Sequence, residues 1–268
     1  MRKIKLILKH AFLMISSLIC LFPFYWMVVG ATNLSKDITK GKLWFGTEFM
    51  NNFRAVQDTA DIFQAILNTA TITIIQVPLA LLICSMAGYG FEKYPSKARN
   101  KLFNVFLLTM MIPFAAIMIP LFNFVFDVGL IDTKVSVIVA ALSNTFLIFF
   151  FRQSFKALPN EMIEAARIDG ASEIGIFFRI AMPPMKSTFA AGFIYAFMKE
   201  WNNYLWPLLT LQSSENRTLT LFLSSISSAY YVDYGQILVS VVIATLPTIL
   251  IFMTMQKHFV SGILGASK

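Results

Sequence analysis

Long apolar stretches without charged residues dominate this sequence, and most of the charged residues lie in the segments between them. A helix that crosses the hydrocarbon core of a bilayer needs roughly 20 consecutive, largely apolar residues. Only 13% of the residues are charged and 57% are hydrophobic, whereas soluble domains carry roughly a quarter charged residues. The sequence therefore predicts an all-α, polytopic membrane protein.

We predict six transmembrane helices. The fifth stretch is interrupted by Lys199 and Glu200 and is still counted as a span. The predicted spans are residues 11–30, 66–91, 102–126, 135–152, 187–211 and 234–256. The length of the chain leaves little room for a separate soluble part, so residues 1–268 are predicted to form a single transmembrane domain.

Basic residues gather on alternate connecting segments. The segment before the first span carries Arg2, Lys3, Lys5 and Lys9, and the second and fourth connections are also rich in Lys and Arg. The first connection, residues 31–62, balances four basic residues with four acidic ones. Because positively charged loops stay in the cytoplasm, both termini are expected there. The first apolar run is longer than that of a usual signal peptide, so we interpret it as an uncleaved helix.

Several other classes of function are disfavoured. The net charge of +8 comes from short basic clusters between apolar stretches, which does not match the basic face of a nucleic-acid-binding domain. Two cysteines and two histidines, far apart, indicate neither a disulfide framework nor a metal site. The spans contain no paired carboxylates and no nucleophile with a neighbouring base, so we predict no catalytic residue and no enzyme activity.

Residues 159–183, in the fourth connection, are the most informative segment. Pro159 suits the beginning of a helix, and Glu161 lies near its positive end. Gly170 is a natural stop, since glycine enters the left-handed region without strain. Ser172 can then cap a second helix. We therefore predict two short helices with a sharp bend at Gly170.

Chemistry alone supports two interpretations of this loop. As a docking element, its small residues Ala165 and Ala166 would let another surface approach closely, with Glu164 and Asp169 adding charged contacts at the rim. Alternatively, the loop is amphipathic and lies on the lipid headgroups, with Glu164 paired to Arg167 on its own helix.

A family resemblance favours docking. Glu164-Ala165-Ala166, followed at fixed spacing by Gly170, Ile180 and Pro183, resembles the signature cytoplasmic loop of permease subunits in ATP-binding-cassette importers. The sequence departs from that pattern at Met182, where the family has Leu, and this swap conserves volume. Further segments resemble the carbohydrate-uptake branch, and the short N-terminus and the tail resemble its maltose-permease G-type subunits; these segments are 87–93, 111–113, 119–120, 129–133, 168–171, 201–208 and 256–266.

The resemblance implies a set of partners. The chain would pair with a different permease subunit in a heterodimer, with two cytoplasmic ATP-binding subunits and with an extracytoplasmic solute-binding protein, in the inner membrane of a bacterial or archaeal cell. The solute would be a sugar or oligosaccharide. The implied ATPase-coupling residues are Glu164, Ala165, Ala166, Asp169, Gly170 and Ala171. The tail after Gln256 is also implied to touch the ATPase subunits.

ATP itself is expected to bind only to the partners. The phosphate-binding pattern Gly-x-x-x-x-Gly-Lys-Ser/Thr is absent from the sequence, so this chain is predicted to hold no cofactor.

The charged pair in the fifth span is the other candidate site. Lys199 and Glu200 lie about 18–20 Å along the predicted helix, where a charge usually faces a cavity or a partner. One hypothesis is that Glu200, Asn202, Asn203 and Tyr204 border the solute path. The other hypothesis is that these groups lock the helix against the partner permease. The resemblance favours this second hypothesis, because G-type subunits contribute less to substrate contact than their partner permease.

Two rival functions stay open. An ion-driven secondary transporter would be expected to show internal repeats, and none is evident in the sequence. A structural subunit of a membrane complex is the other alternative.

Overall fold

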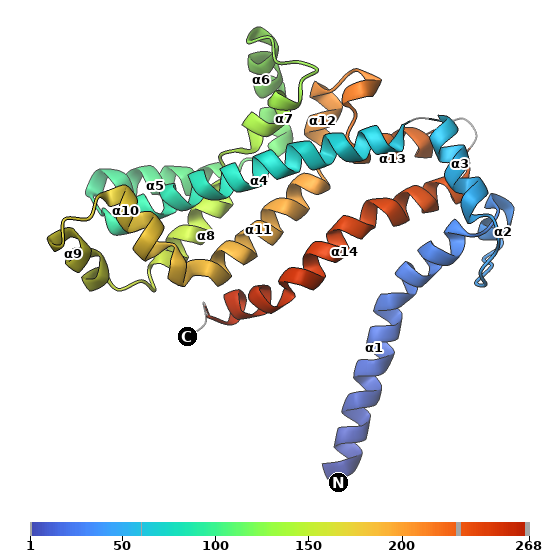
Figure 1. The fold of residues 1–268 in the computed structure, drawn as a ribbon, viewed down its shortest axis with the longest axis horizontal. Coiled ribbons are helices and arrows are strands. Elements are labelled where there is room, and N and C mark those ends of the chain that lie inside the picture. The colour runs from blue at the N-terminus through green and yellow to red at the C-terminus, as the bar shows by residue number, and fades with distance from the viewer. Residues whose placement is uncertain (1, 60, 229–231, 266–268) are drawn as a thin grey trace. The chain divides into compact units, whose positions relative to one another are not determined.

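The computed structural model describes residues 2–59, 61–228 and 232–265, and the side chains within positions 4–257 of these ranges. In this part of the chain all regular structure is helical and no strand occurs, which confirms the all-α part of the predicted fold class (Figure 1). The α-helices are α1 Arg2–Ala31, α2 Ser35–Thr39, α3 Phe49–Thr59, α4 Ile62–Lys93, α5 Lys97–Thr109, α6 Phe114–Asp127, α7 Lys134–Ala141, α8 Thr145–Phe155, α9 Asn160–Ile168, α10 Glu173–Ile176, α11 Lys186–Trp201, α12 Leu205–Thr210, α13 Leu219–Ser227 and α14 Tyr234–Gly265.

The chain divides into two compact units. The first contains Met1–Gln64 and Leu221–Pro247, and the second contains Ala65–Thr220 and Thr248–Lys268. Helices α4 and α14 each begin in the first unit and end in the second. The single transmembrane domain expected over residues 1–268 stays a prediction.

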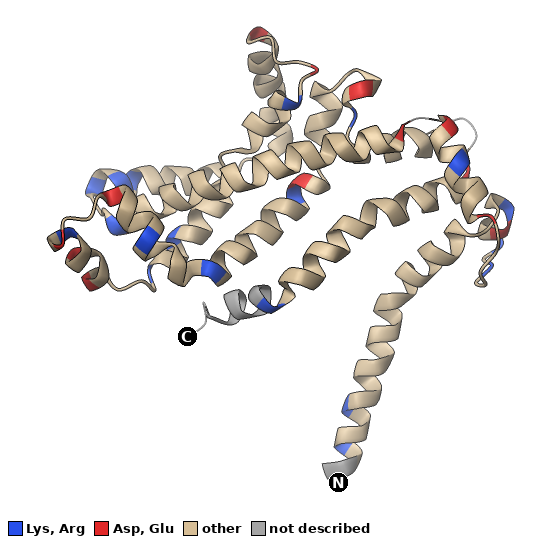
Figure 2. Ribbon diagram, viewed as in Figure 1, with Lys and Arg blue, Asp and Glu red and all other residues tan. Residues whose placement is uncertain are grey.

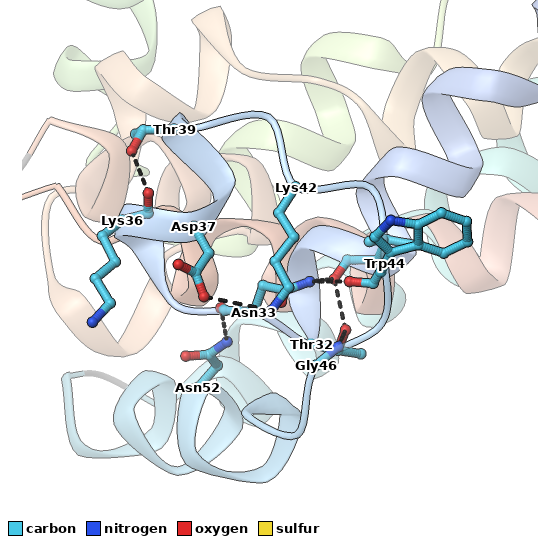
Figure 3. A network of polar contacts seen from close by, with 10 residues as sticks. Thr32, Asn33, Lys36, Asp37, Thr39, Lys42, Trp44, Gly46 and Asn52 are labelled. Atoms are coloured by element: carbon cyan, nitrogen blue, oxygen red, sulfur yellow. Dashed lines mark hydrogen bonds and ion pairs between the residues drawn. The ribbon is translucent and has the colours of Figure 1, made fainter.

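In the first unit, amide side chains hold the end of α1 (Figure 3). The Asn33 side chain donates to the carbonyls of Val29 and Trp44, both at 2.8 Å. The Asn52 side chain donates to the carbonyls of Ala31 and Asn33, both at 3.0 Å. The last carbonyls of a helix have no partner inside it. These amides therefore supply the donors that allow α1 to end inside a packed region.

In the second unit, α4 packs closely against α8 and α11. A Cβ at Gly88 of α4 would lie 2.8 Å from the Arg152 amide nitrogen and from the Phe151 Cβ. A Cβ at Gly192 of α11 would lie 3.1 Å from the Leu81 side chain and 3.3 Å from the Phe151 ring. The two glycines thus set how near the three helices can approach, since no room remains for a larger residue.

Helix length and composition support most of the predicted spans. In the described ranges, four segments are long and apolar enough to cross a bilayer: Ile4–Ala31, Ile62–Lys93, Lys134–Phe155 and Tyr234–Lys257. The helix pair α5 and α6 passes the same test together, but it is bent by 103°. Charged residues are concentrated near helix ends and around α9 and α10, and the middle of α4 carries none (Figure 2). The expected number of six spans stays a prediction.

Three of the predicted spans contain breaks that their apolar composition did not indicate. In the third, α6 begins after Pro113, which lacks a backbone donor and disfavours helical geometry in the residue before it. In the fourth, the Asn144 side chain accepts from the amide of Leu147 at 3.1 Å and so caps α8. These two spans are therefore interrupted where a proline or a capping amide replaces the regular helix bonding.

The fifth predicted span differs most from a continuous helix. Helix α11 is 16 residues long and ends at Trp201, and the short α12 begins at Leu205. The Asn202 side chain donates to the carbonyl of Met198 at 2.8 Å. Asn side chains compete in this way with backbone hydrogen bonding, which explains why the helix stops after Trp201.

The close contact at Gly88 predicts a stability difference between two nearby glycines. Gly88→Ala should lower the midpoint of thermal unfolding of the detergent-solubilised protein, because overpacking costs about 1–3 kcal/mol. Gly90→Ala is the matched control, since a Cβ there would meet nothing within 4 Å. Equal midpoints for the two variants would contradict the packing described for α4 and α8.

Candidate functional site

The second unit contains a partly open cavity of about 650 Å³. All three helix breaks line it: Met110 lies at the first, Asn144 at the second and Asn203 at the third. At membrane depth, irregular backbone is tolerated only where it is buried in protein or lines a water-filled cavity. The convergence of the breaks therefore identifies this cavity as the principal candidate site.

The four residues proposed from the sequence to border a solute path all line this cavity. They are Glu200, Asn202, Asn203 and Tyr204, and Lys199 lies beside them. The Glu200 side chain belongs to a residue that is only 6% exposed, and its two carboxylate oxygens lie 3.4 and 3.5 Å from the Asn203 amide nitrogen. The structure thus gathers a carboxylate, two amides, a phenol and an ammonium group on one wall. A role in solute transfer stays a prediction.

Sequence reasoning missed two polar residues of the cavity, Asn144 and Tyr195. Trp206, in the segment 201–208, also lines it. The Trp206 indole donates to the carbonyl of Ser136 at 3.1 Å, which anchors α12 against α7. The sequence did contain a signal for the break at Asn144. Asn is a preferred helix cap, so an Asn within an apolar run indicates that a helix begins there.

Asp132 connects two loops next to the cavity-lining helices. Its carboxylate accepts from the backbone amides of Gln212 and Ser213 at 2.9 and 3.0 Å. These hydrogen bonds, chiefly the one from Ser213, hold the pKa of the Asp132 carboxyl below its usual range. The segment before α7 and the segment after α12 are therefore tied together by a residue that stays ionised near neutral pH.

The second candidate site is the loop that contains α9 and α10. Both predicted helices are present, and Gly170 between them has a φ of +80°. The Ser172 hydroxyl accepts from the amide of Gly175 at 3.2 Å and caps α10 as expected. A π-helical turn at Phe177–Ala181 then leads toward α11, a feature that the sequence did not predict.

Most of the residues proposed to meet an ATPase are exposed. Ala166 is the exception: it is 7% exposed and, with Ile163 at 2%, forms the face of α9 that packs into its own chain. Met162 and Ile168, two further apolar residues of α9, are exposed at 44% and 86%. The accessible members of the proposed set are Glu164, Ala165, Asp169, Gly170 and Ala171. The side chains after Lys257, and with them most of the implied contact of the tail, lie outside the described residues.

The ion pair of this loop differs from the one in the lipid-headgroup interpretation. Arg167 pairs with Glu173 on α10 at 2.7 Å, rather than with Glu164 on its own helix. This contact, chiefly its hydrogen bond from Arg167, lowers the pKa of the Glu173 carboxyl. The pair therefore contributes fully above the ordinary carboxyl pKa and weakens as the pH falls through the lowered value. Arg167 and Glu173 lie on opposite sides of the bend at Gly170, so their ion pair joins α9 to α10. Glu164 takes no part in this ion pair.

Comparison with known proteins places the chain in a family. Residues 80–265 match the family described as binding-protein-dependent transport system inner membrane component. The chain is 43% identical to the lactose transport system permease protein LacG of Rhizobium radiobacter, covering 100% of this chain and 98% of the relative. It is 36% identical to the arabinooligosaccharides transport system permease protein AraQ of Bacillus subtilis (strain 168), covering 94% and 92%.

A solved structure shares the fold. The chain superposes with a TM-score of 0.84 on a chain from the crystal structure of a bacterial ABC transporter involved in the import of the acidic polysaccharide alginate. The two chains are 22% identical, with 96% of this chain and 97% of the other covered. These matches confirm the resemblance found in the Glu164–Pro183 segment: the chain belongs to the inner-membrane components of binding-protein-dependent transport systems, a family of integral membrane permease subunits.

Proposed function

We propose that this chain forms one half of the translocation pathway of an ATP-binding-cassette importer for a sugar or oligosaccharide, with the cavity at the three helix breaks as part of the solute path. The main support for this proposal is that helix breaks far apart in the sequence meet at one cavity, which is lined by a carboxylate and several amides. A relative named for lactose transport and one named for arabinooligosaccharides support the solute class. Membership of a binding-protein-dependent family argues against a secondary transporter and against a purely structural subunit.

The chemistry of the cavity suits a neutral, hydroxyl-rich solute. The amide groups of Asn144, Asn202 and Asn203 offer both donors and acceptors, which sugar hydroxyls can pair with. Tyr204 and Trp206 add aromatic surface for the apolar faces of a sugar ring. A volume of about 650 Å³ lies within the range of roughly 300–1,000 Å³ that is usual for ligand pockets.

Coupling to ATP hydrolysis is proposed to occur at α9. Its exposed face, which includes Glu164, Ala165 and Asp169, would seat in a cytoplasmic ATP-binding subunit. Closure of two such subunits on ATP would move α9 and the helices attached to it, and so turn the cavity from one side of the membrane to the other as a rigid-body switch. The complete importer would contain this chain, a second permease subunit, two ATP-binding subunits that bind the nucleotide, and a solute-binding protein.

The proposed topology has six spans and both termini in the cytoplasm. Basic residues on alternate connections support this orientation. In this arrangement α11 and α12 together form the fifth span, interrupted at the cavity, and α9 lies on the side of the ATPase subunits.

The docking proposal predicts a specific loss of assembly. Glu164→Lys reverses the charge at the exposed rim of α9, and the ATP-binding subunits recovered with the tagged chain should fall by about tenfold. Glu215→Lys is the matched control, because Glu215 is equally exposed on a loop of the opposite side in the proposed topology. Recovery of the second permease subunit reports folding in both variants. Unchanged recovery of the ATP-binding subunits with Glu164→Lys would refute docking at this face.

The solute path predicts a loss of transport from two cavity residues. Asn202→Ala and Glu200→Gln should lower solute uptake by up to about tenfold, since each hydrogen bond contributes roughly 0.5–1.5 kcal/mol. Asn51→Ala, at an exposed position in the first unit, is the control. Normal uptake combined with poorer recovery of the second permease would favour the alternative that these groups lock the helix against that partner.

The topology predicts labelling from opposite sides. In a chain with Cys20→Ser, a cysteine at Lys186 should react with a membrane-impermeant maleimide only in inside-out vesicles, and one at Glu215 only in right-side-out vesicles. Both positions are exposed in the structure, and they flank α11 and α12. Labelling of both positions from the same side would show that these helices enter and leave on one face, and the six-span topology would then be incorrect.

A further inference from the structure

Two consecutive residues at the end of α4 hold the two ends of α9. The Lys93 ammonium donates to the carbonyl of Leu158 at 2.5 Å and to the side-chain oxygen of Asn160 at 2.9 Å. Asn160 is the first residue of α9, and Leu158 lies just before it. The beginning of α9 is therefore bonded directly to the last residue of α4.

The other end of α9 is held by the next residue, Tyr94. Its hydroxyl donates to the Glu173 carboxylate, which pairs with Arg167 in the last turn of α9. The Arg167 guanidinium also lies 5.0 Å from the centre of the Tyr94 ring, within the range of a cation–π contact. Glu173 thus links Tyr94, the residue that follows α4, to the last turn of α9, and it also closes the bend between α9 and α10. Because contacts from two consecutive residues reach both ends of α9, its orientation is fixed relative to the end of α4.

Farther along, α4 is bonded to a wall of the cavity. The Gln76 side chain donates to the carbonyl of Ala141 at 2.9 Å, at the end of α7. Cys84 lies 3.7 Å from the carbonyl of Asn144, and the Asn144 amide donates to its sulfur at 3.4 Å. Ala141 and Asn144 both line the cavity. Carbonyls at a helix break lack partners in their own helix, so α4 satisfies part of the break that shapes the cavity.

Between these two attachments α4 has no freedom to slide against its neighbour. The contact at Gly88 with the backbone of α8 leaves no gap, and close-packed interiors transmit displacement rather than absorb it. The Arg152 side chain adds an ion pair to Glu92 at 3.3 Å. Helix α4 is also continuous through this region, whereas α7 and α8 are separated by the break.

We propose that α4 transmits movement of α9 to the cavity wall, and that Lys93 and Tyr94 are the positioning residues that make α9 move with α4. This inference rests on the proposed function, because it requires α9 to be the element that the ATP-binding subunits move. The competing route runs along the chain itself, from α9 through residues 156–159 to α8. The Lys93 ammonium donates to the carbonyl of Leu158 within that segment. Removing the ammonium group therefore detaches α4 and leaves the covalent route intact.

The test variant is the double substitution Lys93→Met and Tyr94→Phe, studied in the complete importer in nanodiscs. Neither position lies on α9, and both replacements keep the approximate size of the side chain. Lys40→Met combined with Tyr234→Phe is the matched control, since both residues are exposed and lie outside this contact and outside residues 156–159. Solute moved per ATP hydrolysed should fall about fivefold in the test variant and stay unchanged in the control.

A structural measurement accompanies the activity. Spin labels on cysteines at Ile168 of α9 and Lys101 of α5, both exposed, report the position of α9 relative to the first turns of α5, which begins three residues after Tyr94. With Cys20 replaced by Ser and the buried Cys84 retained, the distance distribution should be narrow in the parent and broad in the test variant. The inference requires that the same variant shows both the broader distance distribution and the lower amount of solute moved per ATP hydrolysed.

A charge exchange provides the rescue. Each of the single variants Arg167→Glu and Glu173→Arg should place like charges together and lower the amount of solute moved per ATP hydrolysed. The double variant should restore that amount to within about twofold of the parent. A double variant as poor as the single ones would overturn the inference, as would normal coupling in the Lys93–Tyr94 variant or an unchanged label distance. Loss of the ATP-binding subunits from the Lys93–Tyr94 variant would also overturn it, since the two residues would then act in docking. A failure of the proposed function would look different. Glu164→Lys would then leave the ATP-binding subunits assembled with the chain, while the Lys93–Tyr94 variant would still broaden the label distances.

Discussion

Backbone hydrogen bonding is the constraint on which the rest of this structure depends. Inside a bilayer each unpaired amide or carbonyl costs several kcal/mol, so a helix can stop only where other groups take over its bonds. Here the side chains of Gln76, Asn144 and Asn202 supply those bonds at breaks in the α7–α8 and α11–α12 segments. The breaks meet at one cavity. The same interruptions that would destabilise a simple bundle thus create a polar wall at this cavity.

The unbroken helix has the complementary role. Helix α4 runs from Ile62 to Lys93 and packs through Gly88 against α8 without a gap. Its last residue is bonded to the start of α9, the next residue reaches the other end of α9 through Glu173, and its middle is bonded to the backbone at the second break. Helix α4 stays continuous through Pro78, although this proline removes one backbone donor. This division between broken helices that shape a cavity and a continuous helix that connects it to a loop suits a transporter driven by an external ATPase.

Local features of the site were largely predictable, and the contacts between distant residues were not. The two helices of the loop, the bend at Gly170 and the cap at Ser172 follow from preferences that act within a few residues. The burial of Ala166 and the pairing of Arg167 with Glu173 depend on which face of α9 meets its own chain. An amphipathic pattern of nine residues is too short to decide that face. The breaks were missed because an apolar composition is compatible with both a continuous and an interrupted helix.

The sequence by itself determined the helical class, the apolar stretches, the alternation of basic connections and the motif that identifies the family, because each depends on composition or on spacing along the chain. Only the tertiary structure decided that Asn144 and Asn203 face one cavity, and that Lys93 and Tyr94 hold opposite ends of α9. Those contacts join residues that are more than fifty positions apart, except within the loop itself. Packing sets them, through the close approach of glycine-bearing helices and the need of every interrupted helix for new hydrogen-bond partners.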